Sequence, residues 1–231
     1  MCNTFYKFPS TPHVVLGGNI SGVNIRNEKI LDDDVKNYLF SHDIYIEEKI
    51  DGANLGISFN NNGNLLLQNR GSYIYEPFIG QWKELNNWIS INQDSLFDIL
   101  GNKYILFGEW CYAKHTIFYN SLPDWFLAFD IYDKTTFKFL SINFRDQLID
   151  RMSLYKVPLL YYGHVNLNQI PKMIGKSKVG NDICEGLYFR YDKDDWLEIR
   201  AKYVKPSFIQ SDDKHWSKKV LIPNQILNRY K

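Results

Sequence analysis

The sequence lacks the features that mark several large classes of protein. Its three cysteines, Cys2, Cys111 and Cys184, form no Cys-x-x-Cys pair and have no histidine at zinc-ligand spacing, which argues against a disulfide framework or a structural zinc. No stretch approaches about 18 uninterrupted apolar residues, and no apolar signal region opens the chain. We therefore expect a soluble, intracellular and cytoplasmic protein with no membrane partner and no obligate protein partner.

Charge of one sign is also scarce. The formal net charge is +1 at pH 7, so the chain as a whole presents no basic field that would attract a polyanion. The segment from Glu198 to Lys231 is an exception, with eight Lys and Arg against three Asp and Glu. This local excess fits either a solvated tail or a surface that contacts phosphate. Aromatic residues, in contrast, make up 16% of the chain and provide stacking faces for bases as well as core material.

The organisation of the chain is simple, because it has no internal repeat, low-complexity run or linker rich in Pro and Gly. A chain of 231 residues can bury one good core, so we predict a single domain over residues 1–231 with a short basic extension at 203–231. Residues 1–40 are expected to form an irregular lead-in. Gly17, Gly18 and Gly22 there predict a turn, since their spacing differs from that of a dinucleotide loop.

Hydrophobic periodicity predicts an α+β domain built on antiparallel strands. Residues 53–59 alternate most clearly, and the turn signal Asn60–Gly63 separates them from the next strand. Helical spacing occurs between Pro77 and Leu100, and a second helix is expected at about 142–153 with Ser141 as its N-cap. The predicted strands are 44–49, 53–59, 65–70, 104–110, 126–132, 185–191 and 196–204. The βαβα rhythm of a doubly wound sheet is absent.

The segment Glu48 to Asn54, with the sequence E-K-I-D-G-A-N, carries the sharpest chemical signal. Lys49 lies between two predicted strands and is followed by Asp-Gly, which places its amine on a tight turn. A lysine amine can attack phosphorus to form a phosphoramidate, provided that it loses a proton whose ordinary pKa is about 10.4. The alternative is a surface lysine beside a common hairpin turn, and Asn54 makes a chance match of the whole pattern rarer.

This segment resembles motif I of the covalent nucleotidyltransferases, the superfamily of ATP-dependent ligases and mRNA-capping enzymes. Segments similar to the other motifs of that superfamily follow in the same order: Arg70-Gly71, Phe107–Trp110 (motif III), Phe126–Asp130 (motif IIIa), Glu185–Leu187 (motif IV) and Arg200–Lys202 (motif V). Each later match is feeble alone, because a core aromatic or a charged strand face would look the same. Their order over residues 48–202 is what favours the resemblance.

The resemblance assigns a role to each matching residue. It implies an antiparallel-sheet adenylyltransferase fold, with ATP and Mg²⁺ or Mn²⁺ as cofactors. The implied roles are a covalent nucleophile (Lys49), partners of the α-phosphate (Arg200, Lys202), nucleotide-binding residues (Glu48, Asn54, Arg70, Glu109, Phe129), metal ligands (Glu185, Asp51) and nucleic-acid contacts (Arg70, Lys205). Because Asp51 by itself would raise the pKa of Lys49, the metal and the basic pair must outweigh it.

Asn54, at a position usually occupied by arginine in DNA ligases and capping enzymes, favours the RNA ligase 2-like branch. The segments Phe8–His13, His215–Trp216 and Ile222–Asn224 are also similar to small stand-alone members of that branch. The implied reaction joins 5′-phosphate and 3′-hydroxyl ends of RNA in three steps, through a lysyl-AMP.

The chain departs from the family pattern in two ways. Arg200 stands where lysine is usual, which keeps the charge but cannot be tuned in pKa as lysine can. The residues after Lys202 are too few for the helical or OB domains that engage nucleic acid in larger relatives. The resemblance therefore predicts adenylylation more firmly than unaided end joining. The alternatives are a DNA-nick ligase, a capping guanylyltransferase, an inactive nucleic-acid-binding relative, and an unrelated α+β domain.

Overall fold

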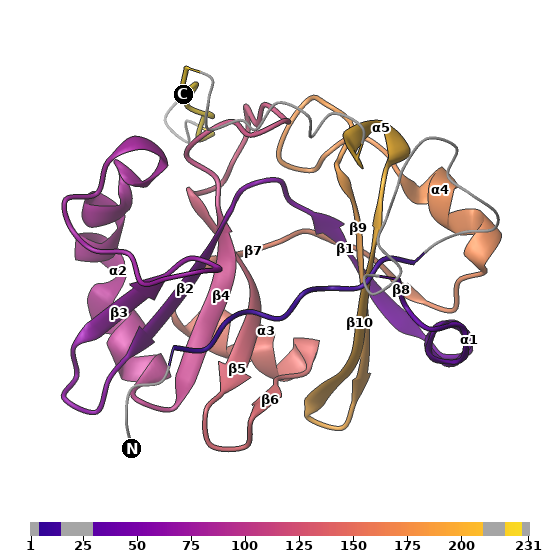
Figure 1. Ribbon diagram of the computed structural model, residues 1–231, viewed down its shortest axis with the longest axis horizontal. Coiled ribbons are helices and arrows are strands. Elements are labelled where there is room, and N and C mark those ends of the chain that lie inside the picture. The colour runs from indigo at the N-terminus through magenta and orange to yellow at the C-terminus, as the bar shows by residue number, and fades with distance from the viewer. Residues whose placement is uncertain (1–4, 15–29, 210–219, 228–231) are drawn as a thin grey trace.

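The computed structural model describes residues 5–14, 30–209 and 220–227 of the chain (Figure 1). The predicted glycine turn at residues 17–22 and the His215–Trp216 segment lie outside these described residues. The described chain forms two mainly antiparallel β-sheets that lie beside each other, and short helices cover their outer faces. The predicted α+β class with antiparallel sheets is therefore confirmed.

The first sheet, called sheet A here, holds the strand that ends in Lys49. Its strand order is β10-β9-β1-β8, and every neighbouring pair is antiparallel. The bounds are β1 (Ile44–Lys49), β8 (Leu159–Gly163), β9 (Gly186–Lys193) and β10 (Trp196–Val204). One face of this sheet is apolar and packs against helix α1 (Asp33–Phe40) and helix α4 (Ile170–Met173), with Ile44, Ile46, Leu187, Phe189 and Ala201 in the shared core.

The second sheet, sheet B, has the strand order β3-β2-β4-β5-β6, and the short strand β7 runs parallel to β5. The bounds are β2 (Ala53–Phe59), β3 (Leu65–Gln68), β4 (Tyr104–Trp110), β5 (Phe126–Asp133), β6 (Lys138–Phe139) and β7 (Tyr155–Lys156). Helix α2 (Leu85–Leu100) and helix α3 (Ile142–Arg151) cover one face, where the largest hydrophobic core lies. Two 3₁₀ turns, η2 (Gly80–Trp82) and η3 (Leu167–Gln169), and the one-turn helix α5 (Pro206–Ile209) complete the fold.

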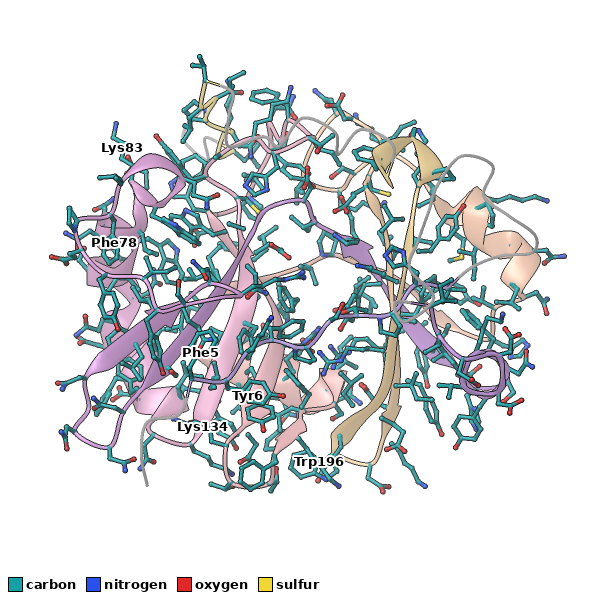
Figure 2. The ribbon with its side chains drawn as sticks, in the orientation of Figure 1. Phe5, Tyr6, Phe78, Lys83, Lys134 and Trp196 are labelled. Carbon is teal, nitrogen blue, oxygen red and sulfur yellow. The ribbon has the colours of Figure 1, made fainter. Side chains whose placement is uncertain are left out.

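Residues 5–14 run along the other face of sheet B and onto sheet A (Figures 1 and 2). The ring of Tyr6 stacks on that of Tyr132 with 3.7 Å between centroids, and Phe8 is buried against Phe107 and Phe139. His13 forms a bridge with Lys202 of β10, and Val14 N–H donates to the Lys202 carbonyl. This N-terminal segment thereby ties the two sheets together beside the space between them.

Most predicted elements agree with the structure, and the exceptions have local causes. The irregular lead-in was a wrong prediction for residues 33–40, because the Asp32 carboxylate caps helix α1 by accepting from Asp34 N–H. The helical spacing that begins at residue 78 overstates helix α2, which starts at Leu85 after the η2 turn. Strand β3 ends two residues early, at Gln68, because Asn69 Oδ1 accepts from the backbone N–H groups of Gly71 and Ser72 and makes a turn.

Candidate active site

The inner face of sheet A, which faces sheet B, is charged. Because side chains alternate along a strand, the apolar residues of β1, β9 and β10 enter the outer core and their neighbours point inward. The inward residues include Glu47, Lys49, Tyr188, Arg190, Arg200 and Lys202. The register of β9 and β10 sets Arg200 opposite Arg190 and Lys202 opposite Tyr188. Such a dense set of charges between two sheets indicates a functional surface rather than a plain core.

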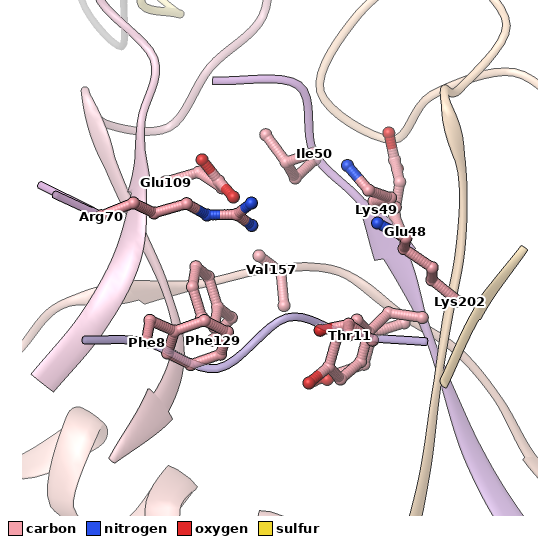
Figure 3. Close-up of a pocket in the computed structure, with 12 residues that line it drawn as sticks. Phe8, Thr11, Glu48, Lys49, Ile50, Arg70, Glu109, Phe129, Val157 and Lys202 are labelled. Carbon is pink, nitrogen blue, oxygen red and sulfur yellow. The ribbon is translucent and has the colours of Figure 1, made fainter. Parts of the chain in front are cut away.

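A cavity of about 500 Å³ opens between the two sheets at the end of β1 (Figure 3). This volume includes space that is open to solvent, so the cavity is a cleft rather than an enclosed void. Its lining combines three carboxylates, three cations and an apolar wall: Phe8, Thr11, Glu47, Glu48, Lys49, Ile50, Arg70, Glu109, Phe129, Val157, Tyr188 and Lys202. The structure thus brings six of the sequence-predicted site residues to one cavity, namely Glu48, Lys49, Arg70, Glu109, Phe129 and Lys202.

Lys49 lies at the end of β1 and forms an ion pair in the cavity. Its Nζ donates to Glu185 Oε2 at 2.6 Å. Burial alone would lower the pKa of Lys49, but the negative charges of Glu185, Glu109 and Asp51 outweigh burial and raise that pKa above its usual value. Burial in turn raises the pKa of Glu185 against the opposing effect of Lys49. The amine is therefore held protonated and in place, and it needs a further positive charge nearby to become a nucleophile.

Glu109 and Asn54 stand side by side on the paired strands β4 and β2. Neither polar atom of the buried Asn54 amide, nor Glu109 Oε2, has a hydrogen-bond partner among the described residues. Burial raises the pKa of Glu109 to about 8, with Lys49 and Arg70 opposing the shift. Because buried polar groups are nearly always paired in native proteins, this pair indicates a place where a ligand or ion makes the missing bonds.

Asp51 anchors a loop with one of its two carboxylate oxygens. Oδ2 accepts from Thr116 N–H at 2.7 Å and from Ile117 N–H at 3.0 Å, and Oδ1 lies 4.0 Å from His115 Nδ1. Its backbone N–H donates to the Tyr119 hydroxyl at 2.8 Å. Gly52, the next residue, is required by close packing, since a Cβ there would lie 2.9 Å from a backbone oxygen of β4. The turn after Lys49 is therefore held rigidly. Because Oδ2 holds the loop, Oδ1 of Asp51 is the oxygen left for the metal-ligand role predicted from the sequence.

Glu48 makes bonds away from the amine of Lys49. Its carboxylate accepts from Ser177 Oγ at 2.5 Å and from Lys178 N–H at 2.8 Å, both in the loop that leads to Glu185. Burial raises its pKa, and these hydrogen bonds oppose the shift. Glu48 thus positions the loop that carries Glu185, while its own side chain also borders the cavity.

The apolar wall of the cavity is formed by Phe129 and Phe8. Their rings meet edge to face with centroids 5.3 Å apart, and Phe129 is partly exposed. Figure 3 shows Arg70 reaching from the end of β3 toward Glu109, above these rings. An aromatic face beside cations and carboxylates suits a nucleotide, which combines a flat base with phosphates.

The three sequence-predicted basic residues of β10 and its end separate in the structure. Lys202 lines the cavity, and its charge lowers the pKa of the nearby Glu185 carboxyl. Arg200 instead donates to Asp130 Oδ2 at 3.2 Å, with its guanidinium 3.8 Å from the ring centroid of Phe139. Lys205 follows the strand, and its backbone N–H donates to the Glu185 carbonyl. Arg200 therefore lies beneath the cavity among buried charges.

Sequence reasoning missed the buried charges that support the cavity. Glu47 pairs with Arg145 at 2.7 Å, and Arg190 forms an ion pair with Asp130. These four side chains are almost fully buried. The only sequence signal for Glu47 and Arg190 was their alternation with apolar residues along β1 and β9. The sequence contains no signal that Arg145 is buried, because an arginine on a helix is usually solvated.

The described part of the chain contains neither a ready-made cluster of metal ligands nor a membrane-spanning helix. Within residues 5–14, 30–209 and 220–227, no group of three or more His, Cys, Asp or Glu side chains lies ready to hold a metal ion. No helix in the same residues has the length and apolar character needed to cross a membrane.

Comparison with known proteins adds a family and a fold. The model of the RNA ligase family matches residues 42–204 of the chain, which include every strand of sheet A and sheet B. No curated protein matches the chain significantly.

Similar solved structures include RNA ligases of Naegleria gruberi. A mutant with ATP and Mn has 18% sequence identity and a TM-score of 0.61, over 77% of this chain and 54% of that one. A mutant with AMP and Mn has 18% identity and a TM-score of 0.60, over 90% of this chain and 64% of that one. An apo mutant has 17% identity, the same TM-score and the same coverage. The chain thus matches only 54–64% of the length of these ligases, and the likeness concerns the fold.

Proposed function

The chain belongs to the RNA ligase family, and we propose that it is an ATP-dependent RNA ligase that forms a covalent lysyl-AMP on Lys49. The observation that carries the proposal is the position of Lys49 Nζ in a cavity that also holds an aromatic wall, two basic side chains and Glu109, with Glu185 bonded to the amine. The similar Naegleria ligases were solved with ATP or AMP and Mn, which supports a nucleotide and a divalent cation as ligands here. We further propose that residues 1–231 act as one adenylyltransferase domain.

In the first step, Lys49 Nζ attacks the α-phosphorus of ATP. A nitrogen–phosphorus bond forms, the bond from that phosphorus to the bridging oxygen breaks, and pyrophosphate leaves. The amine must first lose a proton, which passes to solvent or to the departing phosphate. Because three carboxylates raise the pKa of Lys49, the amine is a poor nucleophile until their charge is offset.

The acids of the cavity fit a divalent cation. Hard carboxylate oxygens suit Mg²⁺ or Mn²⁺, and Glu109 Oε2 has no partner among the described residues. We propose that Glu185 and Glu109 hold the cation and that Asp51 Oδ1 joins them only once the cation binds, because the described residues contain no ready-made group of three acids. The bound cation supplies positive charge that lowers the pKa of Lys49 and stabilises charge on the phosphates.

The remaining residues place the nucleotide. Phe129 offers its ring to the purine, and Asn54 and Glu109 offer the buried polar atoms that the sugar or base would satisfy. Lys202 contacts the α-phosphate from β10, where Arg200 supports the same strand face, and Glu48 holds the loop before Glu185. We assign Arg70 and Lys205 to contacts with the nucleic-acid end. The AMP then passes to a 5′-phosphate before the 3′-hydroxyl displaces it.

The experiment is incubation of the chain with α-labelled ATP and Mg²⁺ or Mn²⁺, followed by denaturing gel electrophoresis. We expect label on the native chain and none on Lys49→Ala, with Lys193→Ala as an exposed-lysine control that keeps the label. Parallel reactions with GTP test the capping alternative. A second assay supplies nicked RNA duplex, nicked DNA duplex and single-stranded RNA to the labelled chain. Absence of label with both nucleotides would overturn the proposed chemistry.

A further inference from the structure

Phe129 occupies a bulge in β5. The register of β4 and β5 pairs Phe107 with Asp130 and then Gly108 with Ala128, so it passes over Phe129. A bulge inserts one residue into a strand and re-aims its side chain, and bulges are common beside functional sites. Gly108 permits this arrangement, because a Cβ there would lie 2.3 Å from the Phe126 ring and 2.6 Å from a backbone oxygen of β5. The ring of Phe129 reaches the cavity from this bulge.

Two buried arginines bind the backbone of the bulged residue. The Phe129 carbonyl oxygen accepts from Arg145 Nη1 at 2.5 Å and from Arg190 Nη1 at 3.3 Å. Arg145 comes from helix α3 and Arg190 from strand β9 of sheet A. The carbonyl is therefore held from two directions by elements that lie far apart in the sequence.

Ion pairs fix both arginines in place. Arg145 binds Glu47 through two contacts, Nη2 to Oε1 at 2.7 Å and Nη1 to Oε2 at 3.2 Å. Arg190 pairs with Asp130 and donates to the Leu140 carbonyl at 2.9 Å. Arg145 is 1% exposed and Arg190 is 0% exposed. A buried guanidinium with these partners has little freedom, so it holds the carbonyl oxygen at a fixed point.

We propose that Arg145 and Arg190 are positioning residues for nucleotide binding, which act through the Phe129 carbonyl to set the angle of the Phe129 ring against the purine. Phe8 supports the ring edge on its other side at 5.3 Å. Stacking depends on the relative angle and offset of the two rings, so a shift of the bulge weakens base binding and leaves the phosphates and Lys49 in place. This inference rests on the proposed function, since it concerns the base of the proposed ATP.

The test compares Arg145→Lys with the native chain for ATP and for ribose 5′-triphosphate, which lacks the base. Lysine keeps the charge near Glu47, but its single nitrogen cannot span Glu47 and the Phe129 carbonyl as the fixed fork of a guanidinium does. We expect KM for ATP in lysyl-AMP formation to rise about fivefold, with kcat and the KM for ribose 5′-triphosphate unchanged. Arg151→Lys, on the exposed end of the same helix, is the matched control and leaves both values unchanged.

A double-mutant cycle separates this role from a general structural one. We expect Phe129→Leu to raise the KM for ATP about tenfold, and the Arg145→Lys/Phe129→Leu pair to be no worse, because the arginine acts through the ring. Effects that multiply, or an equal loss with ribose 5′-triphosphate, would overturn the inference. Arg190→Lys repeats the cycle if Arg145→Lys does not fold, as judged by its thermal unfolding.

The test of the two arginines can fail or succeed independently of the test of the proposed ligase function. If the native chain takes no label from ATP, the ligase proposal fails, and the same cycle is then run on the Kd of ATP measured by calorimetry. We then expect the Kd of ATP to rise in Arg145→Lys and in Phe129→Leu, and to rise no further in the double variant. A labelled native chain whose variants leave KM unchanged would refute the role of the arginines and leave the proposed function standing.

Discussion

Lys49 and Glu185 form an ion pair with 2.6 Å between Nζ and Oε2, although 136 positions separate them in the chain. The pair joins the end of β1 to the residue before β9, so closing sheet A is what assembles it. The contact stabilises the protonated amine, which is the unreactive form. The same carboxylate that positions Lys49 therefore also holds it inactive until another positive charge enters the cavity.

This contact predicts how the rate of lysyl-AMP formation depends on pH and metal. Because the neighbouring acids raise the pKa of Lys49, only the small deprotonated fraction reacts, and the rate should rise with pH through the alkaline range. A bound cation favours the neutral amine, so saturating Mg²⁺ should move that rise to lower pH. Single-turnover label incorporation at several pH values and Mg²⁺ concentrations measures the shift.

The variant Glu185→Gln tests the two contributions of the carboxylate. Loss of its charge lowers the pKa of Lys49, so the alkaline rise should move to lower pH. Loss of a metal ligand should raise the half-saturating Mg²⁺ concentration about tenfold or more. Asp182→Asn, an exposed acid in the same loop, is the control and should change neither quantity. An unchanged Mg²⁺ requirement in Glu185→Gln would remove Glu185 from the metal site.

Glu109 predicts a stability change with pH. Its pKa is about 8 in the folded chain and 4.5 when unfolded, so the folded chain holds a proton that the unfolded chain has lost between these values. The contribution to stability is fully present below pH 4.5 and is lost as pH rises through 8. Glu109→Gln removes this loss, and its Tm should exceed that of the native chain at pH 8 and match it near pH 4.5.

The measurement is thermal unfolding without nucleotide or metal, recorded by circular dichroism across that pH range. Glu198→Gln, which places the same substitution at an exposed residue, should leave the difference at zero throughout. A Tm for Glu109→Gln below the native value at pH 8 would mean that the carboxylate is held ionised by its neighbours.

The fold was predictable where alternation is strong and the contacts are local. Strands β1, β2 and β4 match their predicted bounds, since each combines apolar alternation with a clear turn signal. Strands β6, β7 and β8 were missed because they are short or exposed and exist only through pairing with β5 or β1. Helix α1 was missed because its eight residues are too few to show a clear helical period, and its Asp32 cap carries the signal instead.

The sequence predicted several residues that line the cavity, but it did not predict the buried ion pairs behind them. Motif spacing identified Lys49, Glu109, Phe129 and Lys202, because each is a chemical group that the resemblance names. The Arg145–Glu47 pair connects a helix to a strand 98 positions away, and no local pattern announces such a contact. The same limit explains Arg200, whose sequence neighbourhood resembles a phosphate contact while its guanidinium is bound by Asp130 from the other sheet.

Asp51 offers a prediction that separates loop anchoring from metal binding. Asp51→Asn keeps a carbonyl oxygen for Thr116 and Ile117 N–H, so we expect Tm within about 2 °C of the native value. The loss of charge should raise the half-saturating Mg²⁺ concentration. Asp51→Ala removes the acceptor as well, and its Tm should fall by about 3–6 °C. Thermal unfolding and Mg²⁺ titration of label incorporation give both readings. An Mg²⁺ requirement that stays native in Asp51→Asn would limit Asp51 to the loop.

The two basic residues of β10 should fail in different ways. Lys202 lines the cavity, and we expect Lys202→Ala to lower kcat for lysyl-AMP formation about a hundredfold or more while leaving Tm nearly unchanged. Arg200 binds the fully buried Asp130 and covers the Phe139 ring, so Arg200→Ala leaves Asp130 with one fewer cation. The cost should be about 1–3 kcal/mol, which lowers Tm by about 3–8 °C.

Arg200→Lys decides between support and direct phosphate contact. Lysine retains the positive charge but loses the flat guanidinium that lies 3.8 Å from the Phe139 ring centroid. If Arg200 is a support, Arg200→Lys lowers Tm and leaves kcat within about twofold, because Lys202 still faces the phosphate. A fall in kcat as large as that of Lys202→Ala, at native Tm, would instead mean that the guanidinium leaves Asp130 for the α-phosphate when ATP binds. Label incorporation and thermal unfolding of the same preparations distinguish the two, because the first outcome lowers Tm alone and the second lowers kcat alone.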